Sequence, residues 1–112
     1  MLYLMMDKHD DFYLVKVGLS RDVSKRRRQY RTHNPLAIMR SECAGTEQRE
    51  AQCHSKLIEW GAKRVNGTEW FYVSEELFKQ IYKEGMGAFF PKHSPIYLTE
   101  VFDKKVWEYK TP

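Results

Sequence analysis

A run of basic residues in the first third of the chain could bind phosphate groups. Eight of the 25 residues from Lys16 to Arg40 are basic and only Asp22 is acidic, which gives this segment +7 against +4 for the whole chain. The positive charge is therefore local, and a concentrated positive field on a small domain favours a polyanion such as nucleic acid. A solvated helix face is the alternative. The residues expected to contact nucleic acid are Lys25, Arg27, Arg28 and Arg31.

Five further side chains are candidates for a chemical site. Tyr3 lies in an apolar N-terminal stretch, and Lys16 is followed by a valine and a glycine. Arg26 and Tyr30 are one helical turn apart, so they share a face of the predicted basic helix. Glu69 follows a glycine turn and precedes two aromatic residues. Their alternative roles are packing for the tyrosines, protection of a sheet edge for the lysine, solvation for the arginine, and an N-cap or surface acid for the glutamate.

Alternating strand and helix patterns predict the elements that would position these side chains. Strands are expected over residues 1–6, 12–17 and 36–43, and residues 69–73 should be extended. A first helix should begin at Ser20 or Asp22 and end near Thr32, before Asn34-Pro35. Thr46 should cap a second helix that Gly61 stops, and Ser74 should cap a third helix that runs to about Lys83. The expected fold class is α+β, with a small, mainly antiparallel, three-stranded sheet flanked by helices and followed by a C-terminal aromatic extension.

The predicted hairpin and helices also carry expectations about register and burial. Tyr3 opposite Lys16 would place both side chains on one face of the sheet, with residues 7–12 as the loop. Cys53, Leu57 and Trp60 should form one buried stripe, and Leu77, Phe78 and Ile81 another. Cys43, Cys53 and His54 match no usual zinc-ligand spacing, so a core position for the cysteines is favoured over a metal site.

The composition predicts one globular domain of 112 residues, with 42% apolar and 14% aromatic residues. Residues 1–83 should form this domain, and residues 84–112 should pack on it or on a second copy of the chain. No apolar stretch approaches the roughly 20 residues that a membrane span needs. The short apolar N-terminus also lacks the features of a signal peptide. We therefore expect a cytoplasmic protein, in the host cytoplasm if the gene belongs to a phage.

Residues 1–83 resemble the GIY-YIG endonuclease superfamily, and in particular its divergent phage-type branch with a Lys-Ile/Val-Gly second motif. Arg26 lies eight residues after Gly18, at the spacing of the superfamily's helical arginine, and Tyr30 follows one turn later. The other matching segments are Leu2-Tyr3-Leu4, Lys16-Val17-Gly18, Thr32-His33-Asn34-Pro35, Glu50-Ala51-Gln52-Cys53-His54 and Gly67-Thr68-Glu69-Trp70-Phe71. The chain departs from the family at three points. Met1 replaces the first-motif glycine, Lys16 replaces the second-motif tyrosine, and the asparagine expected near Ile81 has no counterpart.

The resemblance implies a metal-dependent endonuclease or nickase that acts on DNA, most readily double-stranded DNA. Glu69 would hold Mg²⁺ or Mn²⁺, and Arg26 would stabilise the phosphate with two parallel hydrogen bonds. Tyr3 or a metal-bound water would take the proton of the attacking water, and Tyr30 would orient the water or the phosphate. Lys16 would clamp the phosphate unless a lowered pKa lets it act as the base. His54 is a second-tier candidate, for which a contact with Glu50 is the alternative.

Two other functions fit the same residues. A nucleic-acid-binding module of this fold without catalysis is favoured by the substituted second motif and the missing asparagine. A protein-interaction adaptor, or a homodimer, would use the aromatic residues of the extension, such as Trp107 and Tyr109. The sequence shows no helix-turn-helix or zinc finger, so DNA binding would be mainly through phosphates and strongly dependent on salt.

Overall fold

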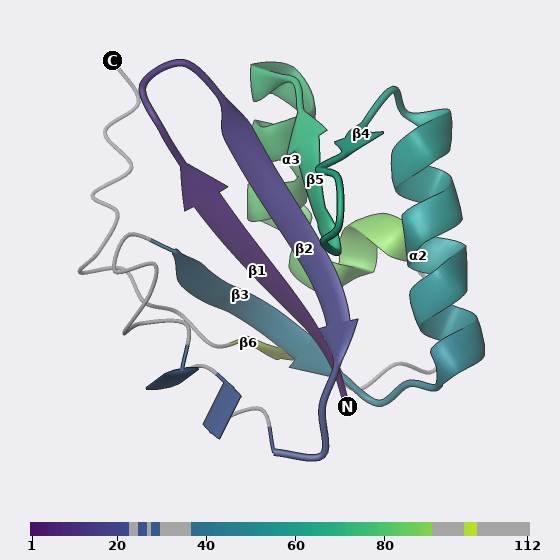
Figure 1. The fold of residues 1–112 in the computed structure, drawn as a ribbon. Coiled ribbons are helices and arrows are strands. Elements are labelled where there is room, and N and C mark those ends of the chain that lie inside the picture. Colours follow the sequence, from purple (N-terminus) through teal and green to yellow (C-terminus); the bar gives the residue numbers. More distant parts are fainter. Residues whose placement is uncertain (23–24, 27, 30–36, 91–97, 101–112) are drawn as a thin grey trace.

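The computed structural model describes residues 1–22, 25–26, 28–29, 37–90 and 98–100. These residues form one six-stranded antiparallel sheet in the order β4-β5-β2-β1-β3-β6, with helices α2 and α3 packed against it (Figure 1). The elements in chain order are β1 (Leu2–Lys8), β2 (Tyr13–Leu19), β3 (Ile38–Cys43), α2 (Glu47–Glu59), β4 (Lys63–Arg64), β5 (Trp70–Val73), α3 (Glu75–Glu84), the 3₁₀ helix η1 (Gly85–Phe89) and β6 (Leu98–Glu100).

The predicted α+β class is confirmed, but the predicted three-stranded sheet is wrong, because the sheet of the described residues has six strands. The extended segment near residues 69–73 joins this sheet as β5, beside β2. Strands β4 and β6 have only two and three residues. Such short strands carry no alternating pattern of their own, and their pairing with a neighbouring strand is what makes them part of the sheet.

The β1–β2 hairpin has a different register from the predicted one. Tyr3 pairs with Gly18, and Lys16 pairs with Met5, so the expected pairing of Tyr3 with Lys16 is wrong. The strands extend to Lys8 and begin again at Tyr13, which shortens the loop. The observed register is shifted by two residues from the predicted one, and the side chains of a strand alternate between faces with a period of two. Tyr3 and Lys16 therefore still share one face of the sheet, as predicted.

The main core lies between the sheet and the two helices. Its buried strand residues belong to the face opposite Tyr3, and Cys53 and Leu57 of α2 and Phe78 and Ile81 of α3 cover them. The predicted burial of Trp60 is wrong, since 41% of this residue is exposed. Helix α2 ends at Glu59, so Trp60 is its C-cap and no longer follows the helical period of the buried stripe. Leu77, predicted to be buried, is half-buried.

The other face of the sheet is called the Tyr3 face here, after the tyrosine at its centre. A second buried cluster on this face contains Tyr3, Met5, Ala37 and Met39, with Trp70 packed against it. Strand β1 is thus buried on both faces, from Leu2 to Met6. This explains why its sequence is apolar throughout instead of alternating.

The caps predicted for the helices are confirmed in the structure. The side-chain oxygen of Thr46 accepts a hydrogen bond from the backbone N–H of Arg49 at 3.3 Å, and Ser74 caps α3 in the same way at 3.1 Å. Gly61 follows α2 with a φ of 91°, in the left-handed region where helices often stop. Residues 25–26 and 28–29 are helical, and Asp22 Oδ1 accepts from the backbone N–H of Lys25 at 2.9 Å.

Several predictions fall outside the described residues. They concern Arg27, Tyr30 and Arg31, the turn at residues 32–35, and the aromatic residues Trp107 and Tyr109 of the extension. Within the extension, Phe89 is buried against the helical core and β6 pairs with β3. None of the helices in the described part of the chain is long and apolar enough to cross a membrane.

Candidate active site

Tyr3 is almost fully buried and its ring crosses directly over Gly18. A Cβ atom added to Gly18 would lie 2.5 Å from Tyr3 Oη and 2.6 Å from Tyr3 Cζ, which is about 1 Å closer than ordinary carbon contacts allow. The backbone of Gly18 is not in the left-handed region, so the close approach of the ring is what requires a glycine here. This contact gives the glycine of Lys16-Val17-Gly18 a role that its position in the sequence did not reveal.

Lys16 lies between Tyr3 and Glu69 on the Tyr3 face. The lysine is only 8% exposed, which is unusual for a charged residue. Its Nζ is 3.9 Å from Oε2 of Glu69 and 5.9 Å from the centre of the Tyr3 ring. The pairing of Lys16 with Trp70 places it next to the start of β5. A buried ammonium group therefore connects two predicted site residues that are 66 positions apart in the sequence.

Glu69 is held by a turn directly before β5. Gly67 has a φ of 75°, and the hydroxyl of Thr68 accepts a hydrogen bond from the backbone N–H of Trp70 at 3.1 Å while it donates to Val65 O at 2.9 Å. The Glu69 side chain is 48% exposed, so its carboxylate reaches solvent while its position is set by the turn. An exposed oxygen ligand of this kind fits Mg²⁺, which keeps most of its waters and takes few protein ligands.

Glu50 and His54 of α2 lie beside the end of β2. His54 Nε2 is 2.8 Å from Val17 O, and the Glu50 carboxylate accepts a hydrogen bond from the backbone N–H of Leu19. Burial raises the pKa of Glu50, and the nearby charge of Glu69 raises it further, whereas His54 and the Leu19 hydrogen bond lower it. The resemblance drew attention to this pair, but their contacts with β2 could not be read from the sequence.

Arg26 lies near the end of β2, where it shares a hollow with Leu19. Its side chain is exposed, its backbone N–H donates to Asp22 O at 3.1 Å, and it lines a shallow hollow with residues at the end of β2 and with Glu47. Lys25 and Arg28 are also exposed, so the described residues of the basic helix present their charges to solvent. The structure thus brings Tyr3, Lys16 and Glu69 together and places Arg26 beside Leu19.

A cluster of metal ligands is not formed by the described residues, since no group of three or more His, Cys, Asp or Glu side chains gathers among them. A metal ion at Glu69 would therefore complete its shell with water and phosphate oxygens. Cys43 and Cys53 are free and buried. Burial raises the pKa of the Cys53 thiol to about 12, which opposes the thiolate form that zinc requires.

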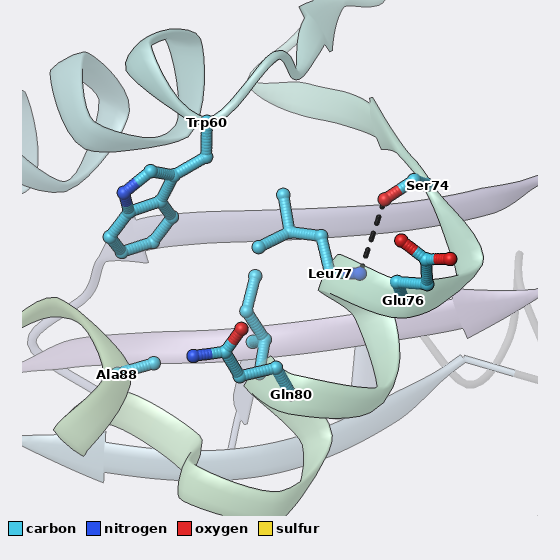
Figure 2. A pocket seen from close by; sticks show the side chains of 7 residues that line it. Trp60, Ser74, Glu76, Leu77, Gln80 and Ala88 are labelled. Atoms are coloured by element: carbon cyan, nitrogen blue, oxygen red, sulfur yellow. Dashed lines mark hydrogen bonds between the residues drawn. The ribbon is translucent and has the colours of Figure 1, made fainter.

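A separate pocket of about 400 Å³ lies between α3 and the end of α2 (Figure 2). The exposed ring of Trp60 and the side chains of Leu77, Gln80 and Ala88 line it. The hydroxyl of Ser74 at its edge already accepts the capping hydrogen bond of α3, drawn as the dashed line in Figure 2. None of the predicted site residues lines this pocket, so it is distinct from the candidate active site.

A family model described as the T5orf172 domain matches residues 1–85. No curated protein and no solved structure matches the chain. The matched range ends within η1 and includes all the residues of the candidate active site.

Proposed function

The chain belongs to the T5orf172 domain family, a phage-associated domain related to nuclease-like folds. From this premise we propose that it is a metal-dependent endonuclease or nickase of the GIY-YIG type, which hydrolyses DNA phosphodiester bonds. The observation that carries the proposal is the placement of Lys16 Nζ 3.9 Å from Glu69 Oε2 and beside the Tyr3 ring. Packing alone gives little reason to bury an ammonium group beside an exposed carboxylate.

Each residue of this group has a role in the proposed reaction. Glu69 would hold Mg²⁺ or Mn²⁺, and the bound metal would polarise the phosphate and neutralise developing charge. Lys16 binds a phosphate oxygen and keeps the phosphate next to Glu69. Tyr3 is 2% exposed, so its ring orients the Lys16 ammonium group more readily than it takes a proton from the attacking water. Arg26 donates two parallel hydrogen bonds to the phosphate backbone beside the end of β2.

A plasmid-nicking assay tests this proposal. Supercoiled plasmid should be nicked by the wild-type chain with Mg²⁺ or Mn²⁺, and Glu69→Ala should reduce the rate by about 100-fold or more, as expected for loss of a main electrostatic group. Glu59→Ala is the matched control, because Glu59 is an exposed carboxylate at the end of α2. Equal rates for the wild type and Glu69→Ala would contradict the role of Glu69.

A nucleic-acid-binding module without catalysis is the second candidate, and the exposed basic helix favours it. Lys25, Arg26 and Arg28 present their charges to solvent. The logarithm of the DNA affinity of such a module should fall with the logarithm of the salt concentration, with a slope of about −0.9 for each phosphate that the protein neutralises. Two results together would select this function. The wild type would not cleave plasmid in the assay above, and the Lys25→Ala, Arg28→Ala double variant would bind DNA more weakly and with less dependence on salt than the wild type.

A further inference from the structure

Strand β1 pairs with β2 as far as Leu19, but on the opposite edge, which faces β5, side chains hold the end of β2. Strand β5 pairs with β2 only from Tyr13 to Lys16, while β2 continues to Leu19. Alternate residues of a strand present their backbone polar groups to the same edge. Val17 and Leu19 therefore have a carbonyl and an N–H on one edge, beyond the end of the β5 ladder. A buried backbone group without a partner costs about 1–3 kcal/mol, so these positions need other partners.

Glu50 and His54 supply these partners from α2. They are one helical turn apart and share a face of the helix. The His54 Nε2–H donates to Val17 O at 2.8 Å, and the Glu50 carboxylate accepts from Leu19 N–H. One side chain thus provides a donor and the other an acceptor, in the places that another strand residue would fill. We call this arrangement the Glu50–His54 clamp.

The His54 ring is fixed from its other side as well. Arg64 Nη2 lies 3.3 Å from His54 Nδ1, and the His54 ring is 5.3 Å from the ring of Phe71. Because Nε2 carries the proton that is donated to Val17, Nδ1 is the acceptor for the guanidinium group. Arg64 also lies over Phe71, with 5.1 Å between the guanidinium carbon and the ring centre. Strands β4 and β5 therefore hold the imidazole against β2.

The clamp lies next to the candidate active site. It occupies the edge of β2 directly after the last β5 pair, Lys16 with Trp70, and the carboxylate of Glu69, the residue before Trp70, is 3.9 Å from Lys16 Nζ. It also fixes the two residues on either side of Gly18, over which the Tyr3 ring lies. We propose that Glu50 and His54 are positioning residues that hold Lys16 and Gly18 in place against Glu69, an inference that rests on the proposed nuclease function.

Two pairs of variants test the clamp. Glu50→Ala and His54→Ala remove the hydrogen bonds to β2, whereas Glu50→Gln keeps an acceptor oxygen and His54→Gln keeps an N–H donor. Gln52→Ala is the matched control, since Gln52 is an exposed residue of the same helix. The alanine variants should lower kcat for plasmid nicking by about 10-fold or more with KM for DNA changed by less than about 2-fold. The glutamine variants should recover most of this loss.

Nuclear magnetic resonance of the 112-residue chain gives a readout that does not depend on cleavage. The Leu19 amide should exchange with solvent at least about 10-fold faster in Glu50→Ala than in the wild type. Broadening by Mn²⁺ of the amide signals of Glu69 and Trp70 should weaken in both alanine variants. Loss of protection at Leu19 with unchanged kcat and unchanged broadening would overturn the positioning role, because the clamp would then serve stability alone.

The same measurements separate failure of the clamp from failure of the nuclease function. A wild type that does not cleave DNA, but whose Mn²⁺ broadening around Glu69 is lost in Glu50→Ala and restored in Glu50→Gln, would support the clamp and remove the nuclease. A wild type that cleaves DNA at the same rate as both alanine variants would keep the nuclease and overturn the clamp.

Discussion

Substitution of Gly18 by alanine tests the contact that links the fold to the candidate site. The new Cβ would meet Tyr3 Oη at 2.5 Å, Cζ at 2.6 Å and Cε1 at 2.9 Å. The Tyr3 ring is buried and cannot swing into solvent. Overpacking of this kind costs about 1–3 kcal/mol, and alanine returns about 0.5–1 kcal/mol because glycine is unfavourable in strands. Because all three contacts are shorter than 3.0 Å, the cost of overpacking should lie in the upper half of its range, at about 2–3 kcal/mol, and we expect a net loss of about 1–2.5 kcal/mol in the free energy of unfolding.

Urea denaturation of Gly18→Ala, with Tyr3→Leu and the double variant, measures this effect. Leucine lacks the phenol atoms that the new Cβ would contact, so Gly18→Ala should be neutral or slightly stabilising in the Tyr3→Leu background. The coupling energy between the two positions should therefore be about 1–3 kcal/mol. Gly67→Ala is the control, because Gly67 has a φ of 75° and open space around it. Its cost, about 1–2 kcal/mol from backbone strain, should be independent of Tyr3.

A Gly18→Ala variant as stable as the wild type would show that the Tyr3 ring does not require a glycine at this position. A loss of stability that remains the same when Tyr3 is leucine would show that the cost arises elsewhere than at the phenol. Nicking by Gly18→Ala should fall together with stability, since displacement of the ring also moves the Lys16 ammonium group.

Three other predictions concern the core, a helix cap and a buried thiol. Leu57→Ala should lower the free energy of unfolding by about 2–5 kcal/mol in urea denaturation, because Leu57 is fully buried; Ile58→Ala, at a residue 54% exposed, should change it by less than about 0.5 kcal/mol. Thr46→Ala removes the side-chain cap of α2 and should cost about 1 kcal/mol in the same assay. Burial raises the pKa of Cys53 from 9.0 to about 12, so above pH 9.0 the unfolded chain releases a proton that the folded chain keeps. Stability should therefore fall as the pH rises from 9.0 toward about 12, and this slope should be weaker in Cys53→Ala when the two proteins are compared at about pH 8 and pH 10.5.

The sequence alone determined those parts of the fold that depend on local patterns. The caps at Thr46 and Ser74 and the helix stop at Gly61 were predicted correctly, because a hydroxyl group or a left-handed glycine acts within a few residues along the chain. The shared face of Tyr3 and Lys16 was also predicted correctly, since the two-residue period of a strand survives an even shift of register.

Tertiary structure decided what depends on contacts between distant segments. Strand β4, with two residues, exists only because Arg64 and its neighbour pair with β5. Trp60 is exposed because α2 ends one residue earlier than its apolar spacing suggests. Gly18 must be a glycine because of a ring that comes from the other strand of the hairpin.

The candidate site likewise depends partly on local sequence and partly on tertiary contacts. Sequence spacing selected Tyr3, Lys16, Arg26 and Glu69 as residue types that suit phosphate chemistry. The sheet brought three of them together and left Arg26 beside the end of β2. The hydrogen bonds of Glu50 and His54 to β2 were invisible in the sequence, because backbone groups look the same at every position. A strand edge without a neighbour becomes apparent only when the sheet is assembled.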